Sequence, residues 1–230
     1  MTDQMLRVMP REMRMMSERI LSLTALPKGF ALMVGDVVLY SQAMGLGGFA
    51  LLLDRIDSLL PADPTRLRLD ETDGLRLDGG GEHAWFVVPS ALDLLREQLA
   101  EGAQAKVEIA NVADPAEIGI AVGLGHRAGL LVEAAGGSLT ARAVPPADPV
   151  LDRVMADGCP IPAKMWWQVW ALAQTALTPD SVVSRRHAGV NIVTDDGQII
   201  GRTDNDDDTD ASFIAAPAFP SEIKTKDLEQ

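Results

Sequence analysis

Cysteine is almost absent from this 230-residue chain, where it occurs once, as Cys159. A single thiol cannot form a disulfide within the chain, and it cannot supply a zinc site that needs several thiolates. No His or Lys lies immediately beside Cys159 to lower its pKa and activate it. We therefore expect Cys159 to be a small, buried, apolar side chain.

Positive charge is also scarce. The chain has 20 Lys and Arg residues against 33 Asp and Glu residues, which gives a formal net charge of −13 at pH 7. Nucleic acids and anionic membrane surfaces attract proteins through clustered Lys and Arg. The densest basic cluster, Arg185–His187, is too short for such a surface. We expect no nucleic-acid partner and no membrane partner.

Long apolar runs are missing as well. The most apolar stretch near the N-terminus, Gly29–Tyr40, is interrupted by Asp36, and no segment approaches the length of a membrane span. Met1–Pro10 lacks the basic region and following apolar run of a signal peptide. Hydrophobic residues make up 47% of the chain and charged residues 23%, as in ordinary globular domains. The composition predicts a globular, cytoplasmic protein.

The residues that usually bind metals or form nucleophiles show no favourable spacing. The three histidines, His83, His126 and His187, are far apart and have no local ligand pattern. The acidic run Asp204–Asp210 alternates like a calcium loop, but Thr209 and Ala215 occupy the positions that require Gly and Glu. No Gly-x-Ser-x-Gly motif is present. We expect no metal site and no serine hydrolase.

Helical spacing dominates the first sixty residues. Met9, Met13, Met16 and Ile20 recur at intervals of four, three and four, which marks one face of a helix. The pattern predicts a second helix from Pro27 to the glycines at 45–48, and a third that ends at Pro61.

Strand and helix signals alternate in the middle of the chain. Residues 66–78 indicate a hairpin around Asp73-Gly74, and Ser90 is a suitable N-cap for a helix that reaches residue 100. Strands are expected at 105–109, 130–134 and 139–144, with a helix from 115 to about 129. This alternation predicts a mixed α/β fold in which helices pack on a partly parallel sheet.

The proline-rich stretch 145–149 is the best candidate for a linker. It suggests a first region at 1–145, a C-terminal region of helix and hairpin at 146–220, and a flexible tail at 221–230. A helix over 163–177 carries three Trp residues, of which Trp166 and Trp170 share a face while Trp167 points elsewhere. Core packing and a subunit interface or ligand wall are both compatible with these indoles. The hairpin is expected at 190–193 and 198–200.

The glycine-rich segment Gly45–Gly48 resembles half of a dinucleotide-binding loop. Such a loop follows a strand and precedes a helix N-terminus, whose N–H groups meet the pyrophosphate. Here a helix precedes the glycines, so the pattern favours a turn between two helices.

A set of short features occurs in a fixed order between residues 10 and 135: Leu26, Pro27, Val34, Asp36, Val37, Gly45, the strand 75–77, the helix from Ser90, Asn111, Gly119 and the segment 127–130. In this order and spacing they resemble a shortened type 2 malate/L-lactate dehydrogenase, a family that reduces 2-oxo acids or cyclic imines with NADH or NADPH. Asn111 and Gly119 fall where that family has an Asn-Ser-x-His-x-Gly segment.

A second pattern lies near the C-terminus. Ser184-Arg185-Arg186 and Thr203-Asp204-Asn205-Asp206 resemble the C-terminal pattern of an uncharacterised bacterial family. The resemblance implies that Ser184, Arg185, Arg186, Thr203 and Asp204 bind a ligand, as does Asn111 in the longer stretch. The same residues are also compatible with ordering of a loop, or with a salt-bridged surface turn.

The chain departs from the dehydrogenase pattern where a proton donor is needed. The resemblance places Phe49 over the family's catalytic His, and Asp114 over its second His. Reduction of C=O or C=N requires a proton donor within hydrogen-bond reach. One interpretation is a non-dehydrogenase relative that binds a small metabolite or acts as an accessory subunit, with no cofactor. The other is an NADH- or NADPH-dependent reductase whose acid is His126, Asp114 or His187. The resemblance also implies a homodimer.

Overall fold

The computed structural model describes residues 4–177, 192–193 and 199–200. The chain forms two units, Met1–Leu177 and Thr178–Gln230. No helix in the described part of the chain is long and apolar enough to cross a membrane. In the second unit, β8 (Ile192–Val193) pairs antiparallel with β9 (Ile199–Ile200), which confirms the predicted hairpin.

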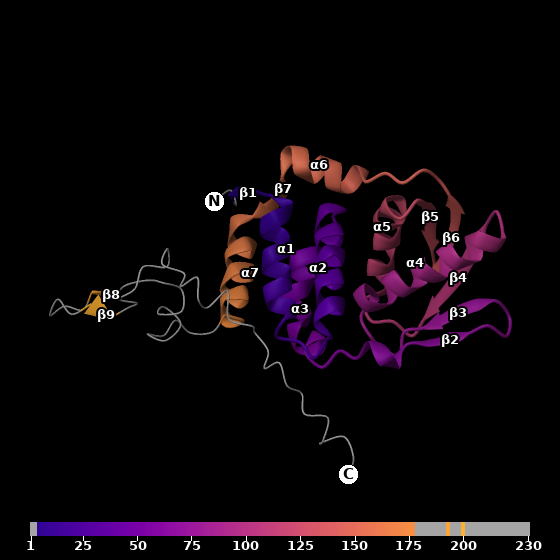
Figure 1. Cartoon of the computed structure of the whole chain (residues 1–230), viewed down its shortest axis with the longest axis horizontal. Helices are drawn as coiled ribbons and strands as arrows, with labels where there is room; N and C mark the ends of the chain where they lie inside the picture. The colour runs from indigo at the N-terminus through magenta and orange to yellow at the C-terminus, as the bar shows by residue number, and fades with distance from the viewer. Residues whose placement is uncertain (1–3, 178–191, 194–198, 201–230) are drawn as a thin grey trace, which may run out of the picture. The chain divides into compact units, whose positions relative to one another are not determined.

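Four helices form one half of the first unit (Figure 1): α1 (Pro10–Leu21), α2 (Lys28–Ala43), α3 (Gly48–Leu59) and α7 (Ala163–Thr175). Met13, Met16 and Ile20 are buried on the predicted face of α1, while Met9 stands at its N-cap. The helices share a core that includes Val34, Leu52 and Trp166. The expected N-terminal helical region is therefore confirmed.

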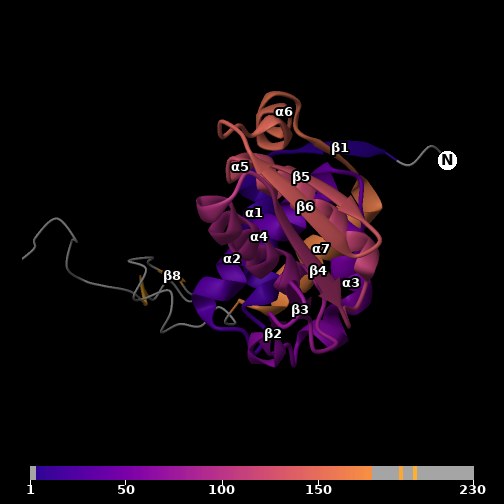
Figure 2. The ribbon, with the colours of Figure 1, turned by 90° about the vertical axis from the view of Figure 1, so that its right-hand side faces the viewer.

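A five-stranded mixed sheet forms the other half. Its order is β2 (Arg68–Asp70), β3 (Leu75–Asp78), β4 (Ala105–Ala110), β6 (Ser138–Ala143), β5 (Leu130–Ala135). Strands β3 and β4 are parallel, joined by α4 (Ala84–Glu101), while the other neighbours in this sheet are antiparallel. In Figure 2 the sheet faces the viewer and helices lie behind it. Helices α4 and α5 (Ala121–Arg127) enclose a second core with the sheet. The predicted mixed α/β class is confirmed.

The N-terminus is joined to the C-terminal part of this unit by a small sheet that the sequence did not indicate. Strand β1 (Met5–Val8) pairs antiparallel with β7 (Cys159–Pro162), so that Val8 lies opposite Cys159. Two prolines in the four residues of β7 argue against a central strand, but an edge position tolerates them. Helix α6 (Pro149–Asp157) precedes β7. Cys159 is buried as expected, and burial raises the pKa of its thiol.

Two local predictions were wrong. Helix α4 begins at Ala84, not after Ser90, because the His83 side chain caps it and Pro89 is accommodated inside. The helix expected over 115–129 is instead a 3-10 turn, η2 (Pro115–Ile120), followed by the short α5.

The prediction for the Trp helix was also wrong in part. Trp166 is buried, whereas Trp167 and Trp170 are exposed and pack against each other with ring centroids 6.4 Å apart. A spacing of three residues makes neighbours on a helix as readily as a spacing of four.

Candidate functional site

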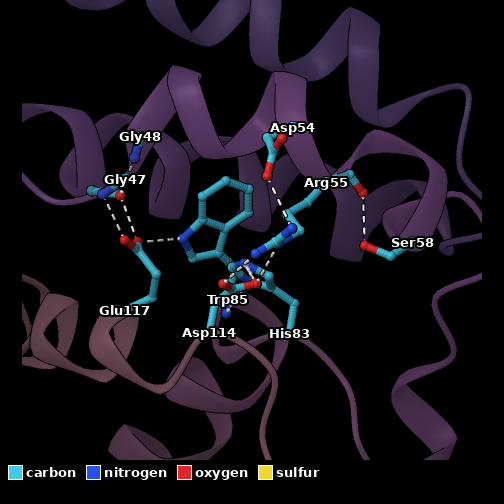
Figure 3. Close-up of polar contacts among 10 residues, drawn as sticks. Gly47, Gly48, Asp54, Arg55, Ser58, His83, Trp85, Asp114 and Glu117 are labelled. Atoms are coloured by element: carbon cyan, nitrogen blue, oxygen red, sulfur yellow. Dashed lines mark hydrogen bonds and ion pairs between the residues drawn. The ribbon is translucent and has the colours of Figure 1, made fainter.

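Two loops run side by side where the parallel strands β3 and β4 end. The Gly79 N–H donates to the Ala110 carbonyl at 2.8 Å, and the Ala113 N–H donates to the Glu82 carbonyl at 2.9 Å. The carboxyl ends of parallel strands are the usual place for ligands in α/β sheets. Helix α3 of the helical half faces these loops (Figure 3), so three segments that are distant in sequence meet here.

The loop after β4 contains two residues in the left-handed conformation, Asn111 (φ 51°) and Asp114 (φ 50°). Non-glycine residues in this region are uncommon and concentrate at functional sites. The Asn111 amide donates to Asp78 Oδ1 at 2.9 Å, which ties the ends of β3 and β4 together. The Asn111 side chain thus has a structural partner at the place where the resemblance implied a ligand.

His83 lies between the α4 N-terminus and Asp114. Its Nδ1 accepts the Trp85 N–H at 3.1 Å, which leaves the proton of a neutral ring on Nε2. Nε2 is buried without a hydrogen-bond partner among the described residues, and it lies 3.4 Å from Asp114 Oδ2. Burial lowers the pKa of His83 to about 4, although Asp114 and Glu117 oppose this shift. The ring is therefore neutral near pH 7.

Asp114 is held from the solvent side by Arg55 of α3. The Arg55 guanidinium donates to the two carboxylate oxygens at 3.0 and 3.2 Å, and it also contacts Asp54 at 2.9 Å. The hydrogen bond from Arg55 lowers the pKa of Asp114. Asp114 is consequently ionised near neutral pH and can accept a proton but not donate one. We call Arg55, His83 and Asp114 the carboxyl-edge site.

A second buried group, Glu117 of η2, lies on the other side of the Trp85 indole (Figure 3). Its carboxyl group accepts hydrogen bonds from Ser41 Oγ at 2.6 Å, Trp85 Nε1 at 2.8 Å and the Gly47 N–H at 2.6 Å. The side chain of Glu117 is 3% exposed. These contacts fix the turn between α2 and α3 to the sheet half, and we call them the Glu117 clamp.

Three backbone amides at the N-terminus of α3 are already hydrogen-bonded within the protein. The Gly47 N–H is bound by Glu117, the Gly48 N–H by Ser41 Oγ at 2.7 Å, and the Phe49 N–H by Gln42 Oε1 at 2.9 Å. A dinucleotide loop needs such amides for the pyrophosphate. The expectation that Gly45–Gly48 is a turn between two helices is confirmed.

Phe49 is enclosed in the core of the helical half. Its side chain is 0% exposed, and its ring packs edge-on against Trp166 with centroids 5.8 Å apart. The position that the resemblance aligns with a catalytic His is therefore an apolar packing position.

The other sequence candidates do not join this site. His126 lies part-buried on α5, and no hydrogen bond or ion pair between its side chain and the carboxyl-edge site occurs in the described part of the chain. Ser184, Arg185, Arg186, His187, Thr203 and Asp204 lie outside the described residues. Within residues 4–177, 192–193 and 199–200, no group of three or more His, Cys, Asp or Glu is arranged to hold a metal ion.

Two positions that carry the sequence resemblance form an ion pair. Arg127 contacts Asp36 at 2.8 Å, and Arg14 contacts the other oxygen of Asp36 at 2.5 Å. Burial raises the pKa of Asp36, but the two arginines outweigh this effect, so the pKa is lower than usual. The pair joins α2 to α5, which is a packing role.

Sequence reasoning missed that Arg55 and His83 meet Asp114, and it missed Glu117 as the centre of the clamp. His83 was considered only as a metal ligand, and Arg55 and Glu117 belong to amphipathic segments in which charged residues are ordinary. The one local signal is the position of His83 directly before a helix, where side-chain acceptors act as caps.

No model of a known protein family matches the chain, and no curated protein matches it. Among solved structures, malate dehydrogenase from Pyrococcus horikoshii OT3 is similar over 55% of this chain and 38% of its own, with 15% identity and a TM-score of 0.44. A dehydrogenase from Sinorhizobium meliloti is similar over 55% of this chain and 42% of its own, with 23% identity and a TM-score of 0.41. The chain thus matches less than half the length of each.

Proposed function

We propose that this protein is a non-dehydrogenase relative of the type 2 malate/L-lactate dehydrogenases that binds a small metabolite at the carboxyl-edge site. The observation that carries the proposal is the complete burial of Phe49, which is 0% exposed. A reductase must hold a proton donor next to the carbon that receives hydride. At this position an aromatic ring packs in the core instead.

The alternative, a reductase with a different acid, has little support from the chemistry of the site. Asp114 is ionised near neutral pH because Arg55 lowers its pKa. His83 is neutral because its pKa is about 4, and a neutral imidazole is a very weak acid. Neither group is a good proton donor near pH 7. At the α3 N-terminus the amides of Gly47, Gly48 and Phe49 already donate to side chains of the protein, which disfavours pyrophosphate binding there.

The charges at the site indicate the kind of ligand. Arg55 contributes one positive charge, and its two partners, Asp54 and Asp114, contribute two negative charges. An anionic 2-oxo acid is therefore repelled, whereas a ligand with an ammonium group is attracted. The Nε2–H of His83 lies 3.4 Å from Asp114 Oδ2 and has no hydrogen-bond partner among the described residues, so it is a candidate donor to a ligand oxygen. We infer a small metabolite that carries an amine and an oxygen acceptor.

The test is a thermal-shift series on the full chain with matched pairs of compounds. Alanine against pyruvate and aspartate against oxaloacetate differ at the amine or oxo group, and NADH and NADPH complete the panel. A ligand present at 100 times its Kd stabilises a protein by about 2.7 kcal/mol, or roughly 5 °C for a chain of this size. We expect shifts with amines and none with reduced nicotinamides.

The matched variants are His83→Asn and His126→Asn. The first keeps an acceptor that caps α4 but removes the Nε2–H donor, so it should abolish the ligand-induced shift. The second alters a histidine outside the site and should retain the ligand-induced shift. Oxidation of NADH or NADPH with any 2-oxo acid or cyclic imine refutes the proposal that the protein is not a dehydrogenase. A shift with pyruvate but not with alanine refutes the charge argument, and no shift with any compound refutes metabolite binding.

A further inference from the structure

Helix α7 presents two large aromatic side chains to solvent. Trp167 is 58% exposed and Trp170 is 44% exposed, while Trp166, beside them in the sequence, is buried. The two exposed rings pack at 77° to each other, so they form one continuous apolar surface. Trp is enriched in the buried centres of protein interfaces and is costly to leave in water. Leu177, which follows the C-terminal end of α7, is also 43% exposed.

The charge pattern of α7 is opposite to the one that its own dipole favours. Lys164, in the first turn, is the only charged residue from 163 to 177. The first turn has no acidic residue and the last turn has no basic residue. A helix N-terminus carries partial positive charge and its C-terminus partial negative charge. Lys164 is therefore placed unfavourably in the isolated helix, and the C-terminal carbonyls lack a cation from the helix itself.

We propose that the exposed face of α7 forms a homodimer in which two copies of the helix pair antiparallel about a twofold axis. An antiparallel arrangement brings Lys164 to the C-terminal end of the other helix, so each copy supplies the cation that its partner lacks. An axis between residues 168 and 169 places Trp167 against the partner's Trp170, and the four indoles form one cluster. Such a contact is self-complementary, as a twofold interface must be.

The near absence of charge on α7 also makes this helix a better place for a second copy to bind than the other surfaces of the protein. Each copy has a net charge of −13, so most approaches bring carboxylates together. From 163 to 177 the helix has no acidic residue. Two copies can therefore meet there without that repulsion. This inference is independent of the ligand proposed for the carboxyl-edge site.

The experiment measures the mass of the full chain in solution by light scattering after size exclusion, over a hundredfold range of concentration. We expect the mass to rise from 24.6 kDa toward twice that value as concentration increases. The double variant Trp167→Ala/Trp170→Ala should remain a monomer over the whole range. Met155→Ala, which removes a side chain that is 58% exposed on α6, should dimerise like the wild type.

The variant Lys164→Glu distinguishes a loss of dimerisation from a loss of folding stability. An acidic residue in the first turn suits the dipole of its own helix, so unfolding by urea should be unchanged or slightly harder. In the dimer the same residue faces the negative end of the partner helix, so the dimer dissociation constant should rise at least tenfold. A wild-type chain that is monomeric throughout overturns the proposal. A Lys164→Glu dimer with the wild-type dissociation constant, or a double Trp variant that still dimerises, overturns it as well.

Discussion

Replacement of Glu117 by Gln is the sharpest test of how the helical half is joined to the sheet half. One carboxyl oxygen of Glu117 accepts from Ser41 and Trp85, and the other accepts from the Gly47 N–H. A glutamine amide has one acceptor oxygen and one NH₂ donor. In the better orientation its NH₂ faces the Gly47 N–H, so one hydrogen bond is lost and two donors oppose each other.

The size of the effect follows from the burial of these groups. A buried polar group without a partner costs about 1–3 kcal/mol. We therefore expect Glu117→Gln to lower the free energy of unfolding by about 2–3 kcal/mol. Glu117→Ala leaves the donors of Ser41, Trp85 and Gly47 without an acceptor, and it should cost about 3–5 kcal/mol.

Unfolding in urea, followed by circular dichroism, measures this difference. With a slope of about 2–3 kcal/mol per molar urea, the midpoint for Glu117→Gln should fall by about 1 M. Glu133→Gln, an exposed substitution of the same chemistry on β5, should change stability by less than about 0.5 kcal/mol. If Glu117→Gln unfolds at the wild-type midpoint, the hydrogen bonds of the clamp do not stabilise the junction and the reasoning is refuted.

Two further predictions concern His83 and the turn glycines. The pKa of His83 is about 4 in the folded chain, below the ordinary value of 6.5, so the unfolded chain binds a proton between these pH values that the folded chain does not. Stability should therefore fall by up to about 3 kcal/mol as the pH drops from 6.5 to 4. His83→Asn should remove this part of the pH dependence, while His126→Asn should retain it, as measured by urea unfolding at several pH values. Equal pH profiles for the wild type and His83→Asn would contradict the assignment of this pH dependence to His83. Gly48 (φ +48°) and Gly45 (φ +75°) are both left-handed, but a Cβ at Gly48 meets Gln42 Cα at 2.6 Å, whereas a Cβ at Gly45 has no heavy atom within 4 Å. Gly45→Ala should cost about 1 kcal/mol and Gly48→Ala at least about 2 kcal/mol more, in the same unfolding assay, and similar costs for both would refute the steric argument.

Most of the fold could be predicted because its elements have strong local signals. The buried face of α1 follows from methionine spacing, and strands β4, β5 and β6 appear within one residue of their predicted limits. The pairing of β1 with β7 could not be predicted, since its register depends on contacts between segments about 150 positions apart. The start of α4 was misplaced because Ser90 offers a stronger local cap than His83, and tertiary contacts decided between them.

The candidate site was predictable only at Asp114 and Asn111, which the resemblance singled out. Arg55, His83 and Glu117 reach the same place through tertiary packing, and no local spacing links them. The resemblance also placed Phe49 at the donor position, but only the structure shows that its side chain is fully buried.

The small sheet at the start of the chain has a consequence for synthesis on the ribosome. Strand β1 is translated about 150 residues before Cys159–Pro162, with which it pairs. At roughly 5–20 residues per second, the nascent segment waits about 8–30 s for its partner. The apolar side of α1 packs against α7 in the folded protein. It stays uncovered during this interval because α7 has not yet been translated. Stalled or truncated translation products that end before residue 159 should therefore be the forms most prone to capture by chaperones.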